Sequence, residues 1–170
     1  MTASLENLAS LLGDAFKKNN YMLATAESCT GGGLSYWITS ISGSSNWFER
    51  GFVTYSDDAK IEQLGVSTTT LKSFGAVSEE TAREMAEGAL LHSLANVAVA
   101  ITGIAGPEGG TVDKPVGTVW VAYALGQSPT KTQMDIYTGS RNEIREKVIE
   151  KALRTLLDLV SATPSPLSSI

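Results

Sequence analysis

Apolar residues recur along this chain with two periods, and each period predicts a different kind of element. Over residues 4–19 they return every three or four positions, which is the spacing of one face of an α-helix. The other expected helices lie at about residues 30–40, from residue 56, from residue 78, and from residue 140 to about residue 160. Short runs that are continuously apolar are typical of buried strands. We expect such strands at residues 21–26, 51–55, 96–102, 117–125 and 130–137.

Serine residues mark the starts of three of these helices. Ser56 and Ser78 are each followed by two acidic residues, and this combination favours a helix N-terminus. Ser140 and Glu143 have the spacing of a capping box, in which each side chain bonds the backbone of the other residue. Residues 126–129 are short enough to join the last two strands as a hairpin.

Strands that alternate with helices predict an α/β fold, a three-layer α/β/α sandwich around a mixed, mostly parallel sheet. The hairpin adds the antiparallel neighbour that makes the sheet mixed. The 170 residues show no internal repeat and no domain boundary, so we expect one domain at residues 1–162 and a disordered tail at residues 163–170. Ligands bind at the carboxyl ends of the strands in such sheets. A site is therefore expected in the loops after Ala26, Tyr55 and Thr102.

The net charge and the rare residue types exclude several classes of function. A net charge of −5 argues against a general nucleic-acid-binding protein, because such proteins use an excess of Lys and Arg to bind phosphates. The single cysteine excludes an internal disulfide, and with His92 as the single histidine neither residue type supplies a metal centre. The N-terminus lacks the features of a signal peptide, and no segment is apolar for long enough to span a membrane. We therefore expect a cytoplasmic protein.

The segment from Glu27 to Gly33 combines a serine with three glycines at the start of an expected helix. Backbone N–H groups around Ser28, together with the positive end of the helix dipole, would suit an oxyanion or a phosphate. Each glycine loses about 1 kcal/mol of helix propensity relative to Ala, which indicates a need for close backbone approach. A plain N-cap serine in a tight turn explains the pattern equally well. Cys29 is more simply a packing residue than a nucleophile, because no histidine is near it in the sequence.

The segment from Tyr55 to Lys60 supplies a candidate base. A lysine acts as a general base only when burial or a neighbouring positive charge lowers its pKa, and a tyrosine hydroxyl can assist the proton transfer. A surface lysine on an exposed helix is the simpler interpretation of Lys60. Ser56 stands four residues before Lys60 and would share its helix face. The spacing alone leaves both Ser28 and Ser56 open as nucleophiles.

Two further segments carry groups that can hold an anion. The glycine-rich stretch that begins at Thr102 and Gly103 lets backbone N–H groups approach a phosphate or sugar, although an ordinary flexible connection explains it as well. It lacks the Gly-Lys-Ser/Thr ending of a Walker loop, and a strand rather than a helix follows it. Arg141 and Arg145 are four residues apart and project from one face of a helix start, where a bound phosphate would offset their unfavourable interaction with the helix dipole. Salt-bridged surface arginines are the alternative.

Taken in order, these segments resemble one family from about residue 5 to residue 160, that of the CinA C-terminal domain. The resemblance is carried by seven pieces of sequence: residues 24–32, residues 51–56 with Lys60, and residues 64–66, 75–78, 102–107, 114–119 and 141 with 145. Characterised members of this family are nicotinamide-nucleotide amidases, which convert nicotinamide mononucleotide to nicotinate mononucleotide and ammonia. The resemblance implies a three-layer α/β/α domain of the stand-alone form, and a homodimer or larger homo-oligomer.

The resemblance also implies roles for residues, with Ser28 as the nucleophile, Lys60 as the general base and Tyr55 as the assisting hydroxyl. We further expect the backbone around Cys29, Thr30 and Gly31 to bind the oxyanion. The ribose phosphate is expected at Thr102, at the Gly103–Gly110 loop, which includes Ala105 and Gly106, and at Arg145, with Arg141 as a second candidate. No metal and no organic cofactor are expected.

One position departs from the family pattern. Asp57 stands where members commonly have Asn, and its carboxylate could keep Lys60 protonated. The alternative function is therefore that of a catalytically silent paralogue, which would bind a nucleotide or a partner without turnover. A hydrolase for another amide is a further alternative.

Overall fold

The structure of the chain is a computed structural model that describes residues 2–162, with side chains from Ser4 onward. Within these residues the α-helices are α1 (Thr2–Asn19), α2 (Gly33–Thr39), α3 (Asp57–Leu64), α4 (Thr68–Phe74), α5 (Glu79–Leu91) and α6 (Arg141–Ala162). The strands are β1 (Leu23–Glu27), β2 (Phe48–Val53), β3 (Val97–Gly103), β4 (Thr118–Leu125) and β5 (Lys131–Ile136). The tail expected at residues 163–170 lies outside the described residues.

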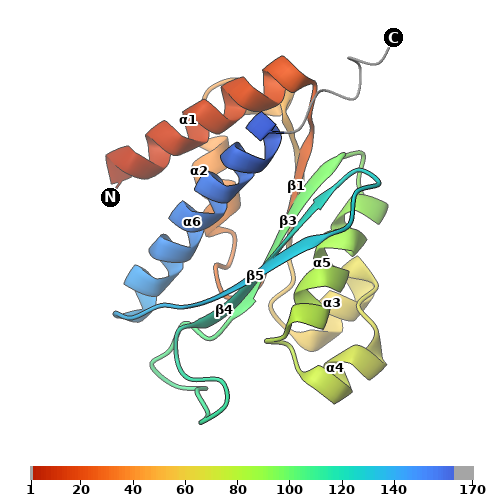
Figure 1. The fold of residues 1–170 in the computed structure, drawn as a ribbon, viewed down its shortest axis with the longest axis vertical. Helices are drawn as coiled ribbons and strands as arrows, with labels where there is room; N and C mark the ends of the chain where they lie inside the picture. Colours follow the sequence, from red (N-terminus) through yellow and green to blue (C-terminus); the bar gives the residue numbers. More distant parts are fainter. Residues whose placement is uncertain (1, 163–170) are drawn as a thin grey trace.

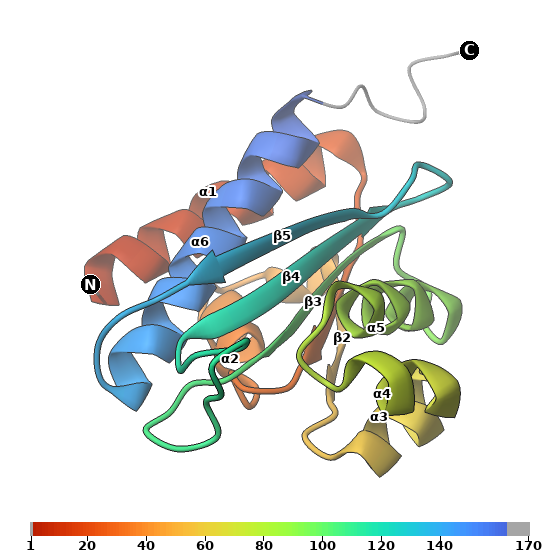
Figure 2. The same cartoon turned by 60° about the horizontal axis from the view of Figure 1, so that its bottom comes forward.

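The strands form one mixed sheet in the order β2-β1-β3-β4-β5. Figure 1 labels β1, β3, β4 and β5 of this sheet, and Figure 2 labels β2. β1 pairs in parallel with β2 and with β3, whereas β4 pairs antiparallel with both β3 and β5. Among the described strands, β4 therefore runs against the other four. Figure 2 shows α1, α2 and α6 on one side of the sheet and α3, α4 and α5 on the other. The predicted three-layer α/β/α fold with a mixed, mostly parallel sheet is confirmed.

The hydrophobic pattern misses or misplaces some short elements. It does not predict α4 or the 3-10 helix at Ser44–Asn46. The sequence of α4 is TTTLKSF, in which threonines of low helix propensity replace a regular apolar face, and the Ser67 hydroxyl caps its first turn. The predicted strand at residues 51–55 is displaced, because β2 spans Phe48–Val53. Charged Glu49 and Arg50 interrupt the apolar pattern of this edge strand.

The two faces of the sheet carry side chains of different size. Val99 and Ile101 of β3 belong to the core that packs against α1, α2 and α6. Ala98 and Ala100, which alternate with them, belong to the core that packs against α5, because successive strand residues point to opposite faces. Small residues let the helices on this side approach closely. At Gly88 of α5 an added Cβ would collide with the backbone of α3.

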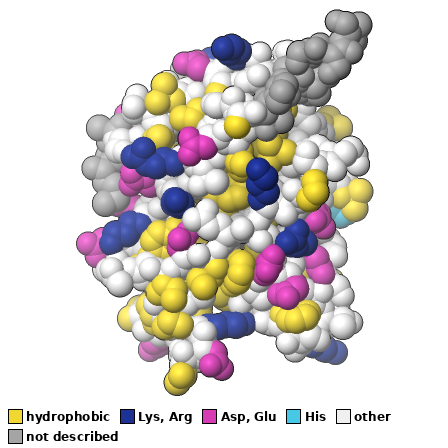
Figure 3. All heavy atoms as spheres, in the orientation of Figure 1, with side chains coloured by type: hydrophobic (Ala, Val, Ile, Leu, Met, Phe, Trp, Pro, Cys, Tyr) yellow, Lys and Arg dark blue, Asp and Glu magenta, His cyan; other side chains and the backbone are white. Residues whose placement is uncertain are grey.

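Positive and negative side chains are interspersed on the face shown in Figure 3, without a continuous basic area. This distribution agrees with the net charge of −5 and offers no extended surface for a nucleic-acid backbone on that face. In the part of the chain that the structure describes, no helix has both the length and the apolar character needed to cross a membrane.

Candidate active site

The carboxyl ends of three parallel strands meet at one end of the sheet. Glu27, the last residue of β1, pairs with Val53 of β2 and with Ile101 of β3. The loops that follow these strands therefore start side by side. They enclose a pocket of about 270 Å³ together with the start of α6. The pocket is lined by nine of the expected site residues: Ser28, Cys29, Tyr55, Lys60, Thr102, Gly103, Ala105, Gly106 and Arg141.

A serine and a lysine meet at the base of this pocket. The Nζ atom of Lys60 lies 3.2 Å from the Oγ atom of Ser28. Both side chains are buried, with 1% of Lys60 and 8% of Ser28 exposed. A charged lysine donates along this line to the serine oxygen, whereas a neutral lysine can accept the serine proton along the same line. The pair thus has the geometry of a nucleophile and its base.

Backbone carbonyl groups, rather than a carboxylate, hold the Lys60 ammonium. Its Nζ donates to the carbonyl oxygens of Thr54 at 3.1 Å, Tyr55 at 3.2 Å and Ser56 at 3.5 Å. None of the four ion pairs among the described residues involves this lysine. Burial lowers the pKa of Lys60 below the ordinary value of 10.5, and the nearby Asp57 carboxylate opposes part of that shift. The lowering increases the neutral fraction that a general base requires.

Ser56 has a different position from Ser28. It is the N-cap of α3, where its Oγ accepts a hydrogen bond of 3.1 Å from the backbone N–H of Ala59. It is exposed, and it meets Lys60 through its carbonyl oxygen. The geometry therefore brings the hydroxyl of Ser28, and not that of Ser56, to the lysine.

Glycine is required at the three positions after Thr30 for separate structural reasons. Gly31 and Gly32 adopt positive φ angles of 57° and 92°, which side chains with a Cβ rarely adopt. At Gly33 an added Cβ would lie 2.8 Å from the Cδ1 atom of Ile149 in α6. The positive φ angles delay the start of α2 to Gly33 instead of the expected residue 30. Much of the glycine requirement thus comes from the turn itself and from its packing against α6.

Glu27 is a positioning residue that the sequence pattern does not single out. It is fully buried, and its carboxylate accepts hydrogen bonds from the backbone N–H groups of Leu34 (2.9 Å) and Ser35 (3.0 Å). The Ser35 hydroxyl donates a third bond of 2.7 Å. This carboxylate caps α2 and fixes the turn that contains Ser28. An acidic residue at the end of a buried strand, directly before a glycine-rich helix start, is the signal that could have revealed it.

The turn leaves few N–H groups free for an oxyanion. Gly31 donates its N–H to the Ser28 carbonyl at 3.0 Å, and Ser28 donates its own to Ile101. Within the described part of the chain, no other residue accepts a hydrogen bond from the backbone N–H of Cys29 or Thr30. The Cys29 side chain itself is buried in the core, and burial raises the pKa of its thiol to about 11. Its thiol thus stays protonated near neutral pH, as expected of a packing residue.

The two expected arginines have different surroundings. Arg141 lines the pocket and donates to the Gly106 carbonyl (2.8 Å) and to the Tyr55 hydroxyl (3.0 Å). Arg145 lies outside the pocket lining and donates to the Thr30 carbonyl at 3.0 Å. Arg141 is therefore the arginine that lies in the pocket, and Arg145 contacts the turn that follows Ser28. Thr30 and Gly31 lie outside the lining as well.

The glycine-rich loop between β3 and β4 forms another wall of the pocket. Thr102 donates its hydroxyl proton to the Ala76 carbonyl at 2.8 Å, which ties this wall to the segment between α4 and α5. Ala76 and Val77 of that segment also line the pocket. Sequence reasoning did not place them in the site, although residues 75–78 belong to the family resemblance. At Gly103 an added Cβ would lie 2.6 Å from the Val119 side chain.

Residues 2–162 contain no group of three or more His, Cys, Asp and Glu side chains that could hold a metal ion. His92, the single histidine, is the C-cap of α5 and lies outside the pocket lining. The pocket thus offers a serine, a lysine and an arginine as its reactive and cationic groups.

In structural terms the protein is an α/β/α sandwich. It has a buried serine–lysine pair at the carboxyl ends of its parallel strands. The profile of the CinA C-terminal domain matches residues 5–160. The chain belongs to this family.

Relatives match over nearly the whole of each chain. Nicotinamide-nucleotide amidohydrolase PncC of Escherichia coli (strain K12) is 48% identical over 154 residues, which are 91% of this chain and 93% of that protein. The protein of the same name from Pseudomonas putida is 44% identical over 155 residues, which are 91% and 96% of the two chains. The crystal structure of competence/damage inducible protein CihA from Agrobacterium tumefaciens has a TM-score of 0.89 at 47% identity and covers 92% of this chain and 95% of that chain. The predicted family membership is confirmed.

Proposed function

We propose that this chain hydrolyses the carboxamide of nicotinamide mononucleotide to nicotinate mononucleotide and ammonia. Relatives that are 44% to 48% identical over nine-tenths of the chain are named nicotinamide-nucleotide amidohydrolases. The observation that carries the proposal is the 3.2 Å approach of Lys60 Nζ to Ser28 Oγ in a buried setting. It pairs a nucleophile with a base in a chain whose single histidine lies elsewhere.

Acylation begins when neutral Lys60 takes the proton of Ser28 and the serine oxygen attacks the amide carbon. The direct route is supported by the 3.2 Å distance. The Tyr55 hydroxyl accepts a hydrogen bond from Arg141, so we assign Tyr55 to the ligand-facing wall, and its help in the proton transfer stays a prediction. Lys60 then gives its extra proton to the amide nitrogen, ammonia leaves, and an ester of Ser28 remains.

The oxyanion of each tetrahedral intermediate needs hydrogen-bond donors that are already in position. We assign this role to the backbone N–H groups of Cys29 and Thr30, which have no acceptor on other residues in the described structure, rather than to that of Gly31. In deacylation a water molecule gives a proton to Lys60 and attacks the ester carbon. Lys60 returns the proton to Ser28, and nicotinate mononucleotide leaves as the acid.

The ribose phosphate is assigned to the wall formed by Arg141 and the loop from Gly103 to Gly106. The Arg141 guanidinium has donors beyond the two that bond Gly106 and Tyr55, and a guanidinium suits bidentate binding of a phosphate. Ala105 and Gly106 supply backbone to the same wall. The mechanism needs no metal and no organic cofactor. Recycling of pyridine nucleotides, a cytoplasmic location and a homo-oligomeric state stay predictions.

The test is release of ammonia from nicotinamide mononucleotide by the purified chain. Ser28→Ala should reduce the rate by about 10⁴-fold or more, because the acyl-enzyme cannot form. Ser56→Ala is the matched control, since it removes the hydroxyl of the other candidate serine but keeps the carbonyl that Lys60 contacts. Its rate should stay within a few-fold of the wild type. If Ser28→Ala kept its rate, or if the wild type bound the nucleotide without releasing ammonia, the silent-paralogue alternative would replace this proposal.

A further inference from the structure

The pocket carries more negative charge than a site for a simple phosphate ester would need. Its lining contains two carboxylates, Asp57 and Glu108, and two cationic side chains, Lys60 and Arg141. Lys60 must be neutral when it acts as the base. In that state Arg141 is the one fixed cation in a lining that also contains two carboxylates. Such a lining favours a ligand that carries a positive charge in addition to the phosphate assigned to Arg141.

The proposed substrate contains both charges. Its phosphate is anionic, whereas its pyridine ring is cationic because the ring nitrogen is bonded to the ribose. The carboxamide is attached directly to this ring, so the ring must lie beside Ser28 when the amide carbon does. The negative charge of the lining can stabilise the cationic ring only if a carboxylate lies near Ser28.

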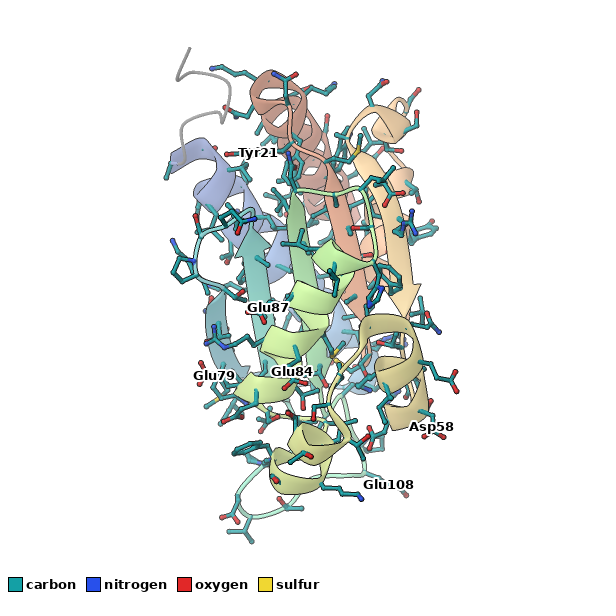
Figure 4. All side chains as sticks on the ribbon, turned by 90° about the vertical axis from the view of Figure 1, so that its right-hand side faces the viewer. Tyr21, Asp58, Glu79, Glu84, Glu87 and Glu108 are labelled. Atoms are coloured by element: carbon teal, nitrogen blue, oxygen red, sulfur yellow. The ribbon has the colours of Figure 1, made fainter. Side chains whose placement is uncertain are left out.

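Asp57 is such a carboxylate. It is the first residue of α3 and precedes Lys60 by three positions, so the two residues start from the same side of the helix. Burial lowers the pKa of Lys60, and the charge of Asp57 acts against that shift, which places its field at the Ser28–Lys60 pair. Glu108 lies on the exposed loop between β3 and β4. In Figure 4 the labelled Asp58, the neighbour of Asp57, and Glu108 both lie near the end of the sheet where the pocket opens.

We propose that Asp57 is a specificity-determining residue that favours amides on a cationic pyridinium ring over amides on a neutral ring. This inference rests on the proposed function, because it takes the amide of the nucleotide to lie at Ser28. Asp57 touches neither reacting atom. It acts through the electrostatic attraction between its carboxylate and the ring, which solvent partly screens because the side chain is exposed.

The experiment compares two ligands that differ in ring charge, oxidised nicotinamide mononucleotide and its reduced, uncharged dihydropyridine form. Dissociation constants are measured by calorimetry on Ser28→Ala protein, in which neither ligand is consumed. The same measurement is made after adding Asp57→Asn. We expect the preference for the oxidised over the reduced nucleotide to fall about threefold when this charge is removed. A protonated Lys60 would repel the cationic ring alone, and Asp57→Asn changes the pKa of Lys60. The ratio is therefore measured across pH and compared on the alkaline plateau, where Lys60 is neutral in both proteins.

Asp58→Asn is the matched control, because Asp58 also lies in the first turn of α3 but outside the pocket lining. It should leave the ratio unchanged. An unchanged ratio in Asp57→Asn, or an equal fall in Asp58→Asn, would overturn the inference. Ammonia release by the wild type is recorded in parallel. If the wild type releases ammonia and the ratio does not move, the inference alone fails, whereas an absence of ammonia release is a failure of the proposed function.

Discussion

The two ends of the pocket are built in opposite ways. At one end Ser28 and Lys60 are almost fully buried, and each is held by backbone groups of a turn. At the other end Tyr55 is 61% exposed, and it meets an exposed Arg141. A buried polar pair is fixed in place and strongly affected by each charge near it, whereas exposed groups are screened by water. We therefore expect the buried end to control the rate constant and the exposed end to control substrate binding.

The largest effect should follow from replacing the buried lysine. Lys60→Met keeps an unbranched apolar stem but removes the base, so kcat for ammonia release should fall by about 10³-fold or more. Lys147→Met is the control, because that lysine also donates to a backbone carbonyl, on Thr138, but outside the pocket lining. Its kcat should stay near that of the wild type. A Lys60→Met protein with a changed KM and an unchanged kcat would contradict the division between the two ends.

Lys60→Met should also change how the free energy of unfolding depends on pH. Burial lowers the pKa of Lys60 in the folded protein below the value of 10.5 that applies when the chain is unfolded. At a pH between these two pKa values, Lys60 is protonated in the unfolded chain and neutral in the folded chain. The contribution of Lys60 therefore makes the wild type more stable as pH rises. The variant lacks this contribution. Denaturant titrations across this range should show the wild type gaining stability relative to Lys60→Met with increasing pH.

A smaller effect is expected at the exposed end. Arg141→Ala removes a charged donor to a phosphate, which is worth about 1.5–3 kcal/mol, so KM for nicotinamide mononucleotide should rise roughly tenfold to hundredfold with a smaller change in kcat. The riboside, which lacks the phosphate, should be turned over equally by both proteins. Arg154→Ala is the control, because Arg154 lies on the same helix and pairs with Glu150 instead. An equal loss on the riboside would show that Arg141 does not bind the phosphate.

The sequence predicts the layers of this fold and the loops that enclose the pocket well, because both depend on local patterns. The alternation of strand patterns with helix patterns predicts the α/β/α sandwich. The loops of the pocket are those that follow three of the apolar strands. In contrast, α4 has no apolar periodicity, and it becomes helical through its cap at Ser67 and through Glu84 of α5, which binds the Ser67 N–H at 2.7 Å. That support comes from a residue distant in the sequence, so no local pattern contains it.

Roles of single side chains were harder to predict than their positions. Arg141 and Arg145 have the same spacing and helix, yet one reaches the Gly106 carbonyl across the pocket and the other the Thr30 carbonyl outside its lining. In the sequence Lys60 resembles a surface lysine. In the fold it is buried, and the carbonyl groups of the preceding turn accept its hydrogen bonds. Such differences arise from the tertiary arrangement of loops, which periodicity does not describe.

The smallest effect should come from Asp57, an exposed carboxylate whose charge acts on the buried Lys60. Burial lowers the pKa of Lys60 and Asp57 opposes that shift, so Asp57→Asn should lower the pKa further. Because neutral lysine is the active form, the rate rises with pH through this pKa, and the variant should reach its full rate at a lower pH. Its kcat should exceed that of the wild type on the acidic side of the profile and approach it at high pH. Asp58→Asn should leave the profile in place, and a shift of the Asp57→Asn profile to higher pH would show that the carboxylate does not oppose the base.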